Sequence, residues 1–351
     1  MVSDRLGAFL RTAGATDADI EQAEASGWLP VLALDRMLMP GVPEFDVAGL
    51  AEHSEAEVDE LERMWRALGF PDLPDGLVVF TRRDLEAIER LRGIPGGPMA
   101  GAMGALREPE RPARILSAAL ARVAAYEVEV FAASLDQLRS AGVDDDAAAL
   151  ALVESFDWDN LAWFVDYIHR LQFRAAAWRR LTSVTATGTL ELGVGFVDLS
   201  RYTELSEELD DAGLAGLLDQ FETVTSDTVA EFGGRVVKTI GDEVMFVGPP
   251  DAVASISLAI LERARAIEEL PSVRVGISFG PVLARAGDYF GPTVNLASRT
   301  TDRARPGSIL ASEAMFHALD GDERFVWKAL APRRIRGIGT VRLFALRPPS
   351  P

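Results

Sequence analysis

The sequence contains no cysteine. A disulfide framework, a thiolate nucleophile and a cysteine-ligated metal site are therefore all excluded. Histidine is nearly absent as well, since only His53, His169 and His317 occur along 351 residues. So few and so widely separated histidines do not form the ligand pattern of a zinc site.

Long apolar runs are also missing. No stretch of about 18 apolar residues occurs, so we expect no transmembrane helix. The first ten residues include Asp4 and Arg5 and have no signal-peptide core. These features predict a cytoplasmic protein.

Basic residues are outnumbered, with 35 Lys and Arg against 54 Asp and Glu and a net charge of −19. Repulsion from phosphates argues against a nucleic-acid partner or an anionic membrane surface. The acidity does not indicate disorder, because 48% of the residues are apolar and periodic patterns run along most of the chain. The length is sufficient for two domains, each with its own core.

The first half of the chain has helical periodicity. Ser3 and Thr16 are candidate helix N-caps, and Ser54 to Glu57 have the sequence of a capping box. The pattern predicts helices over 3–25, 54–68, 112–140 and 144–180, and a short helix after Thr81. We therefore expect an all-α domain over 1–181 that ends in a connecting helix, with a joint before a second domain at 189–351. A helix-turn-helix DNA reader is disfavoured, because no basic recognition face is present.

Methionines and aromatic residues recur in this helical half. Such flexible and polarisable side chains can line an adaptable apolar pocket for a lipid or fatty acid. Ordinary core packing is the alternative, and the sequence alone favours it. The candidate residues are Met37, Met39, Trp65, Phe70, Met99 and Met103.

The second half alternates between strand and helix patterns. Two Val-rich runs flank Gly241 and Asp242, which indicates a hairpin with a two-residue turn and a positive φ at the glycine. The order β-α-β-β-α-β predicts a ferredoxin-like α+β fold with additions. The expected elements are strands at 192–199, 236–240, 243–247, 273–279, 282–286, 308–311, 325–329 and 341–346, helices at 203–232, 251–270 and 293–303, and a loop at 287–292.

Polar residues interrupt this pattern at the ends of strands. Asp198 follows an apolar strand and Asp242 lies in the hairpin turn. Each alone is typical of a cap or a turn, but two carboxylates at the ends of neighbouring strands can converge on Mg²⁺ or Mn²⁺. Asn295 and Arg299 are four residues apart and share one helix face.

Three segments in this half, FVDLSRYT at 196–203, KTIGDE at 238–243 and DYFGPTVNLASR at 288–299, together resemble the class III nucleotidyl cyclase homology domain. The resemblance covers roughly the C-terminal half and implies an adenylate cyclase that converts ATP to 3′,5′-cyclic AMP and pyrophosphate. More loosely, the first half resembles the helical regulatory domain of actinobacterial cyclases of the pH-responsive, autoinhibited type.

The resemblance also implies a role for each polar residue. Two metal ions, Mg²⁺ or Mn²⁺, would be held by Asp198 and Asp242, adenine would be read by Lys238 and Asp288, the transition state would be served by Asn295 and Arg299, and the nucleotide phosphates would be contacted by Arg336. In the family, each site draws its metal carboxylates from one protomer and its other residues from the second. The resemblance therefore implies a homodimer with shared active sites.

One position departs from the family pattern. Pro281 follows Gly280 where some class III cyclases carry an arginine, so that role either falls to Arg285 or is absent.

Two other functions remain open. A guanylate cyclase would be expected to carry Glu and a Cys-like residue at positions 238 and 288, and a catalytically silent nucleotide-binding dimer usually lacks a metal Asp or the Arg.

The connecting helix offers a route for regulation. It carries His169, and histidine is the residue type whose charge ordinarily changes near neutral pH, so protonation there could favour one of two arrangements of the dimer. A solvent-facing histidine without a role is the alternative, and the sequence favours it.

Overall fold

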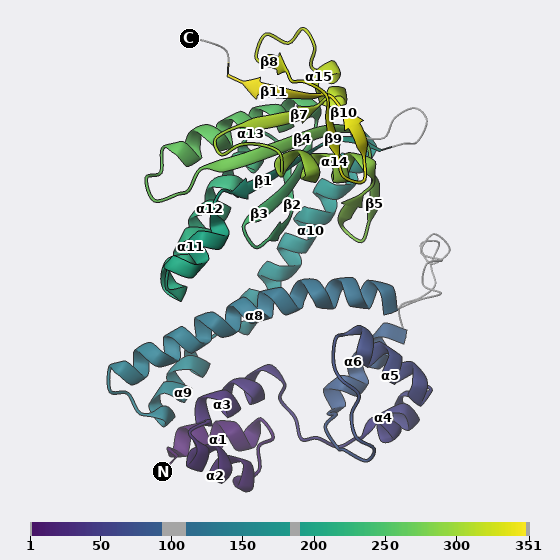
Figure 1. The fold of residues 1–351 in the computed structure, drawn as a ribbon. Coiled ribbons are helices and arrows are strands. Elements are labelled where there is room, and N and C mark those ends of the chain that lie inside the picture. The colour runs from purple at the N-terminus through teal and green to yellow at the C-terminus, as the bar shows by residue number, and fades with distance from the viewer. Residues whose placement is uncertain (1, 93–109, 183–189, 349–351) are drawn as a thin grey trace. The chain divides into compact units, whose positions relative to one another are not determined.

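The computed structural model describes residues 2–92, 110–182 and 190–348 (Figure 1). It divides into two compact units, Met1–Tyr167 and Ile168–Pro351, and the division falls inside helix α10 (Trp158–Thr182). Two of the candidate pocket residues, Met99 and Met103, and nearly all of the predicted joint lie outside the described residues. Within the described ranges, no helix has both the length and the apolar character needed to cross a bilayer.

The first unit is helical, as predicted. Besides the first part of α10, its helices are α1 (Asp4–Thr12), α2 (Asp17–Ser26), α3 (Leu29–Leu38), α4 (Val47–Ser54), α5 (Val58–Ala67), α6 (Arg82–Arg92), α8 (Glu110–Ser140) and α9 (Asp145–Ser155). One apolar cluster joins α1, α2 and α3 to α9, and a second is centred on Phe45, Leu50 and Phe80. The core of this unit is therefore divided between small clusters.

Both predicted N-caps at the start of the chain are confirmed. The Ser3 hydroxyl accepts a hydrogen bond from the Leu6 N–H, and Thr16 forms a reciprocal capping box with Asp19. These caps begin two separate helices, so the single helix predicted over 3–25 is wrong. Gly14 lies between them with a φ of 96°, a backbone conformation that glycine adopts readily.

Two other helix predictions are corrected for the same kind of reason. Ser54 ends α4 instead of capping the next helix, because Glu55 turns into the left-handed conformation, and Glu57 precedes α5 without a side-chain cap. The helix predicted over 144–180 is interrupted after Ser155, where the Asp157 side chain accepts a hydrogen bond from the Asn160 N–H. A left-handed backbone at Glu55 and a side-chain bond at Asp157 thus mark helix boundaries that apolar periodicity does not reveal.

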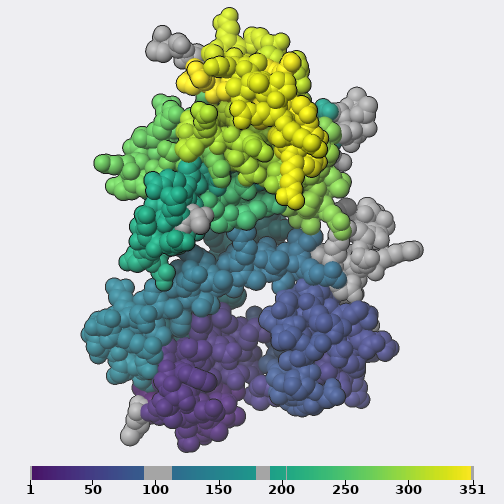
Figure 2. All heavy atoms as spheres, in the orientation of Figure 1, coloured from purple at the N-terminus to yellow at the C-terminus, as the bar shows by residue number. Residues whose placement is uncertain are grey.

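The second unit is built on a mixed sheet. Its strands are β1 (Glu191–Leu199), β2 (Arg235–Ile240), β3 (Glu243–Gly248), β4 (Val273–Pro281), β5 (Leu283–Arg285), β6 (Asp288–Phe290), β7 (Ile309–Ser312), β8 (Val326–Ala329), β9 (Arg333–Ile335), β10 (Gly339–Val341) and β11 (Leu343–Arg347). Its helices after α10 are α11 (Tyr202–Glu208), α12 (Asp211–Glu231), α13 (Pro250–Arg265), α14 (Pro292–Thr301) and α15 (Glu313–Ala318). The seven-stranded sheet has the order β2-β3-β1-β4-β7-β11-β8, and its first four strands confirm the ferredoxin-like prediction. Figure 2 shows the C-terminal segment, in yellow, gathered at one end of this unit.

The sheet carries a core on each face. Along β1, Val197 and Leu199 pack with α12 and α13, whereas Val194 and Phe196 pack with α14. Because side chains alternate along a strand, Asp198 projects from the α14 face. Alternation thus directs one carboxylate out of an otherwise apolar strand, beside the helix that carries Asn295.

Two predictions in this unit are corrected. The helix expected over 203–232 is two helices, since Asp210 caps α12 through the Gly213 N–H. The loop expected over 287–292 contains β6, which pairs with β5 so that Arg285 lies opposite Asp288. A short β5–β6 hairpin therefore presents Asp288.

Glycine permits close packing around β1 and β4. A Cβ atom at Gly276 would lie 2.2 Å from the backbone nitrogen of Thr301, and one at Gly195 would lie 2.2 Å from the Phe246 ring. Because Gly276 has no side chain, the backbone of α14 can approach β4 closely.

Candidate active site

The predicted metal ligands lie together at the end of β1. Asp198 is the second-last residue of the strand and is 7% exposed, and Asp242 occupies the turn between β2 and β3. The backbone N–H of Leu199 donates to the Asp242 carbonyl at 3.1 Å, and the Asp242 carboxyl group is close enough to raise the pKa of Asp198. The turn predicted from the sequence is present, with a φ of 60° at Gly241.

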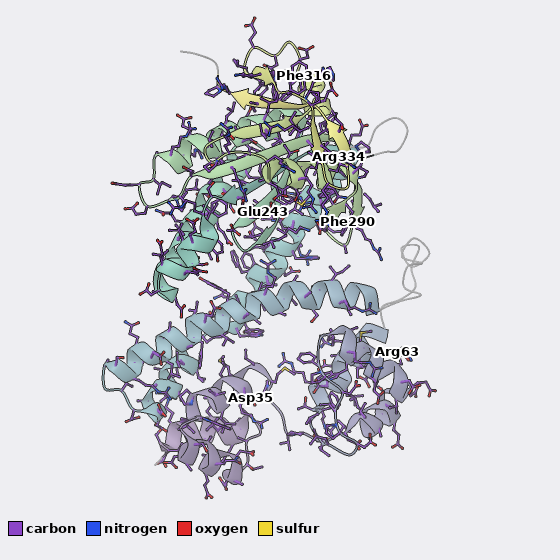
Figure 3. All side chains as sticks on the ribbon, viewed as in Figure 1. Asp35, Arg63, Glu243, Phe290, Phe316 and Arg334 are labelled. Carbon is purple, nitrogen blue, oxygen red and sulfur yellow. The ribbon has the colours of Figure 1, made fainter. Side chains whose placement is uncertain are left out.

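The electrostatics of this pair are unfavourable without a cation. Burial and the hydrogen bond with Asp242 raise the pKa of Asp198 to about 6, although Arg274 beside it acts in the opposite direction. Burial, followed by the charge of Asp198, raises the pKa of Glu243 to about 7. Several acidic groups therefore compete for protons in one small region (Glu243 is labelled in Figure 3).

The chemistry of the donor set fits a divalent cation. Adjacent carboxylates repel each other when both are ionised, and a bound cation relieves that repulsion. Mg²⁺ is commonly held by one or two carboxylates together with substrate phosphates. Within the described ranges, no group of three or more His, Asp or Glu side chains is placed to hold a metal ion.

The predicted base-reading residues also meet. The Lys238 ammonium donates to Asp288 Oδ2 at 2.5 Å, and the Tyr289 N–H donates to Asp288 Oδ1 at 2.7 Å. The register of β2 against β3 shifts between Val236 and Lys238, so Val237 is an extra residue in the strand. This bulge places Val237 and Lys238 together on the α14 face, because Val237 packs with the apolar cluster there.

The remaining predicted residues are exposed. Asn295 and Arg299 share the open face of α14, whose other face is buried through Val294 and Ala297. The Arg299 guanidinium lies 3.5 Å from Asp302. Arg336 is exposed in the turn between β9 and β10, directly after a strand.

Sequence reasoning missed Arg274. Its Nε donates to Asp198 Oδ2, and the register places the two residues directly opposite each other on β1 and β4. An arginine among the valines of a predicted strand was a signal that could have been noted. Its partner depends on strand order and register, which no local pattern reveals.

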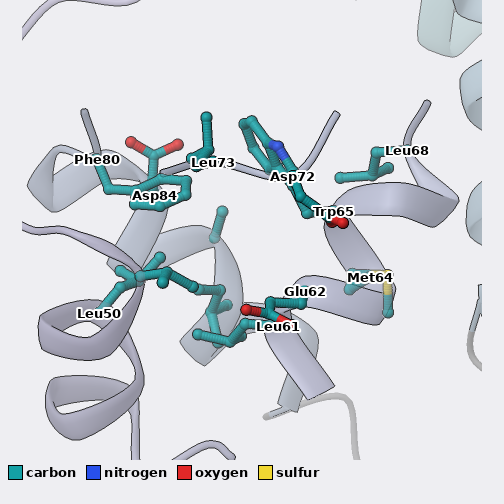
Figure 4. A pocket seen from close by; sticks show the side chains of 13 residues that line it. Leu50, Leu61, Glu62, Met64, Trp65, Leu68, Asp72, Leu73, Phe80 and Asp84 are labelled. Carbon is teal, nitrogen blue, oxygen red and sulfur yellow. The ribbon is translucent and has the colours of Figure 1, made fainter. Parts of the chain in front are cut away.

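A separate cavity lies within the first unit (Figure 4). It has a volume of about 140 Å³, and its walls are mainly apolar side chains from α4, α5 and α6 and from the segment between α5 and α6. The predicted Trp65 lines it, and the predicted Phe70 stacks on Trp65 with ring centroids 4.6 Å apart. Glu62, Asp72 and Asp84 place carboxylates along its lining.

Comparison with protein families identifies the second unit. A family profile described as the adenylate and guanylate cyclase catalytic domain matches residues 184–348. This match includes each of the seven predicted site residues.

Similarity to whole proteins extends over nearly the entire chain. An adenylate cyclase of Glutamicibacter nicotianae is 31% identical over 339 residues, covering 90% of this chain and 82% of that protein. An adenylate cyclase of Streptomyces coelicolor is 30% identical over 345 residues, covering 90% and 89%. A pH-sensitive adenylate cyclase of Mycobacterium tuberculosis is 36% identical over 191 residues, covering 52% and 48%.

Solved structures with a similar fold are also cyclase domains. The adenylyl cyclase CyaB from P. aeruginosa superposes with a TM-score of 0.41 at 25% identity, covering 46% of this chain and 95% of that one. The catalytic core of a rhodopsin-guanylyl cyclase with converted specificity, in complex with ATPαS, gives a TM-score of 0.44 at 24% identity, covering 46% and 98%.

Proposed function

Because this chain belongs to the class III nucleotidyl cyclase family, we propose that its second unit converts ATP to 3′,5′-cyclic AMP and pyrophosphate. The observation that carries the choice of ATP is the pair formed by Lys238 and Asp288 at 2.5 Å. The pair presents a donor for adenine N1 and an acceptor for the 6-amino group. Guanine offers the opposite pattern, and a site built for one set of polar groups rejects the other strongly.

The mechanism follows from the placement of the polar residues. The ribose 3′-oxygen attacks the α-phosphorus, the bond to pyrophosphate breaks, and the 3′-hydroxyl proton passes to water or to a substrate phosphate. Asp198 and Asp242 would hold two divalent cations, Mg²⁺ or Mn²⁺, whose chemistry is to acidify that hydroxyl and neutralise phosphate charge.

Two arginines act on the phosphates, and an asparagine acts on the ribose. On α14, Arg299 balances the negative charge that grows on the α-phosphoryl group. A preorganised donor of this kind typically lowers the activation free energy by about 3–4 kcal/mol. Asn295 orients the ribose from the same helix face. Arg336, exposed after β9, contacts the phosphates.

A direct experiment tests this function. Purified full-length protein is supplied with ATP or GTP and with Mg²⁺ or Mn²⁺, and the cyclic nucleotide and pyrophosphate are quantified. Cyclic AMP should form only with metal, and Asp242→Asn should abolish it, whereas Asp251→Asn, at an exposed ion pair with Arg324, should not. Binding of ATP without turnover would favour the silent dimer, and equal use of ATP and GTP would refute adenine selection.

Base selection can be altered directly. Exchanging Lys238 for Glu and Asp288 for Cys supplies the groups expected of a guanylate cyclase. Use of GTP relative to ATP should then rise by orders of magnitude. The ratio of kcat/KM for the two nucleotides measures this change, and an unchanged ratio would remove Lys238 and Asp288 from base recognition.

The active unit should be a homodimer with two shared sites. The chain itself supports this, because α8 and α10 expose large apolar side chains such as Tyr126, Trp163 and Phe173, and exposed apolar surface marks interfaces. Mixing Asp198→Ala chains with Arg299→Ala chains should restore about a quarter of the wild-type turnover, since half of the dimers are mixed and each has one intact site. Inactivity of purified heterodimers would exclude shared sites.

We further propose that the first unit regulates this activity through a lipid-like ligand. Its cavity is similar in size to an engineered apolar cavity of about 150 Å³ in another protein, which binds benzene. It can therefore take the end of an alkyl chain. The three carboxylates in its lining favour a neutral head group over a free fatty acid.

The ligand test uses full-length protein. Ala87→Phe should obstruct the cavity and abolish any response to monoacylglycerol or oleate, whereas Ala18→Phe, on the exposed surface of α2, should not. Identical turnover of all three proteins with and without either lipid would exclude a regulatory ligand here.

A pH response is the second regulatory proposal. His169 is exposed in α10, two residues after the first unit ends. His169→Ala should flatten the pH profile of turnover between about pH 5 and 8 without changing the preference for adenine. An unaltered pH profile would exclude His169 as the pH-sensing group.

Dependence on ATP as substrate also supports a cytoplasmic location.

A further inference from the structure

Two contacts hold β2 against the β5–β6 hairpin. The first is the ion pair between Lys238 and Asp288, at 2.5 Å. In the second, the guanidinium carbon of Arg235 lies 5.2 Å from the centroid of the Tyr289 ring, which is the geometry of a cation–π interaction. Neighbouring residues of the hairpin, Asp288 and Tyr289, are thus each held by one cation of the bulged strand.

The first contact is shared with the base during recognition. The Lys238 ammonium has three N–H donors and the Asp288 carboxylate can accept more than one hydrogen bond, so adenine would bind groups that also bind each other. The ion pair then no longer serves the hairpin alone. The second contact involves neither of the base-reading groups and can therefore remain.

Tyr289 transmits its position to Asp288 through the backbone. The Tyr289 N–H donates to Asp288 Oδ1 at 2.7 Å, which leaves Oδ2 as the oxygen that faces Lys238. Holding the Tyr289 ring therefore also orients the carboxylate that would accept from the adenine amino group.

Packing around the hairpin is incomplete, because Tyr289 packs against the apolar cluster that includes Val194 and Met245 but also borders a cavity. Arg235, Asp288 and Tyr289 line a cavity of about 480 Å³. The Arg235 Nε is buried and has no hydrogen-bond partner among the described residues, and its Nη1 lies 3.5 Å from the Val236 carbonyl. A buried N–H without a partner is unfavourable and needs an explanation, and stacking on Tyr289 supplies one.

We propose that Arg235 is a positioning residue for base selection. By holding Tyr289, it keeps Asp288 in place while Lys238 and Asp288 bind the adenine. This inference rests on the proposed reading of adenine by Lys238 and Asp288. It assigns to Arg235 an effect on nucleotide choice without any contact with the nucleotide.

The test compares Arg235→Met, which keeps the length of the side chain without its charge, with Arg235→Lys, which keeps a cation. Arg324→Met is the matched control, because Arg324 is exposed and pairs with Asp322. Loss of the stacking should raise the KM for ATP about 3- to 30-fold, the range that corresponds to typical cation–π interactions. The kcat should stay within about twofold, and the ATP over GTP ratio of kcat/KM should fall by a factor similar to the rise in KM.

Arg235→Lys should recover most of both properties, and Arg324→Met should match the wild type. Hydrogen–deuterium exchange across 283–290 should be faster in Arg235→Met than in Arg235→Lys, and this readout does not depend on turnover. Unchanged KM and selectivity in Arg235→Met would overturn the inference, even if its melting temperature falls. Equal rises in KM for ATP and GTP would also overturn it. If the wild-type protein forms no cyclic AMP, the proposed function is wrong. In that case the exchange measurement still tests Arg235, and an unchanged exchange rate in Arg235→Met would refute its positioning role.

Discussion

The two units stabilise their structures in different ways. The second unit has a seven-stranded sheet whose central strands are buried on both faces, and its candidate site residues lie on strands, a tight turn and a packed helix. The first unit consists of helices around small separate clusters, with a cavity beside one of them. Phosphoryl transfer needs groups fixed to within a fraction of an ångström, which a packed sheet provides. A regulatory unit benefits instead from a core that can change its packing when a ligand enters.

The sharpest test of this contrast is the loss of a rigidly held group. Asp198→Asn keeps the size of the side chain but removes a proposed metal ligand, so cyclic AMP formation should fall about 1,000-fold or more. Circular dichroism should show an unchanged fold. Turnover near the wild-type level with Mn²⁺ would mean that the site does not depend on this carboxylate.

Tight packing of the second unit predicts intolerance of even one methyl group. Gly276→Ala should reduce the free energy of unfolding by about 3 kcal/mol, because the new Cβ would displace α14 from β4. Gly216→Ala is the control, since no atom lies within 4 Å of its Cβ position on α12. It should be neutral or stabilise the helix by about 0.5–1 kcal/mol. Similar denaturation midpoints for the two variants would contradict the described packing.

The first unit should lose less when a core side chain is shortened. Leu50→Ala, beside the existing cavity, should reduce the free energy of unfolding by about 2 kcal/mol, the low end for such changes, because the neighbouring apolar side chains can move inward. Calorimetry should show a lower transition for this unit and an unshifted one for the other. A shift of both transitions would mean that the two units unfold together.

The smallest effect is expected at a helix cap. Thr16→Ala removes the bond from the Asp19 N–H to the Thr16 hydroxyl but keeps the bond from the Thr16 N–H to the Asp19 carboxylate. It should reduce the stability of the first unit by about 1 kcal/mol. Hydrogen bonds from Thr16 lower the pKa of Asp19. The stabilisation by Asp19 is therefore fully present above its unfolded pKa, near 3.8, and is lost as the pH falls through its lower folded value. Urea denaturation at pH 7 and pH 3 should show a smaller effect of Thr16→Ala at pH 3.

The same contrast explains what could be predicted from the sequence. The hairpin around Gly241 and Asp242 was predicted well because its signals are local: two Val-rich runs and a glycine with a positive φ. Ser54 was assigned to the wrong helix because its neighbours allow either a cap or a helix end, and tertiary packing decides between them. Arg274 was missed because its partner is set by the pairing of β1 with β4. The hairpin could thus be predicted from the sequence, whereas the pairing of Arg274 with Asp198 across the sheet could not.

The bond from the Leu199 N–H to the Asp242 carbonyl has a consequence for how this protein can change over generations. It ties the end of β1 to the turn between β2 and β3, so the spacing of the two carboxylates depends on main-chain geometry. Neighbouring side chains can be substituted without altering that spacing. An insertion or deletion in the turn, however, would displace Asp242 relative to Asp198. Lineages that descend from this chain should therefore vary the length of other surface loops, such as the one after β8, while the Gly241-Asp242 turn keeps its length for as long as the site is used.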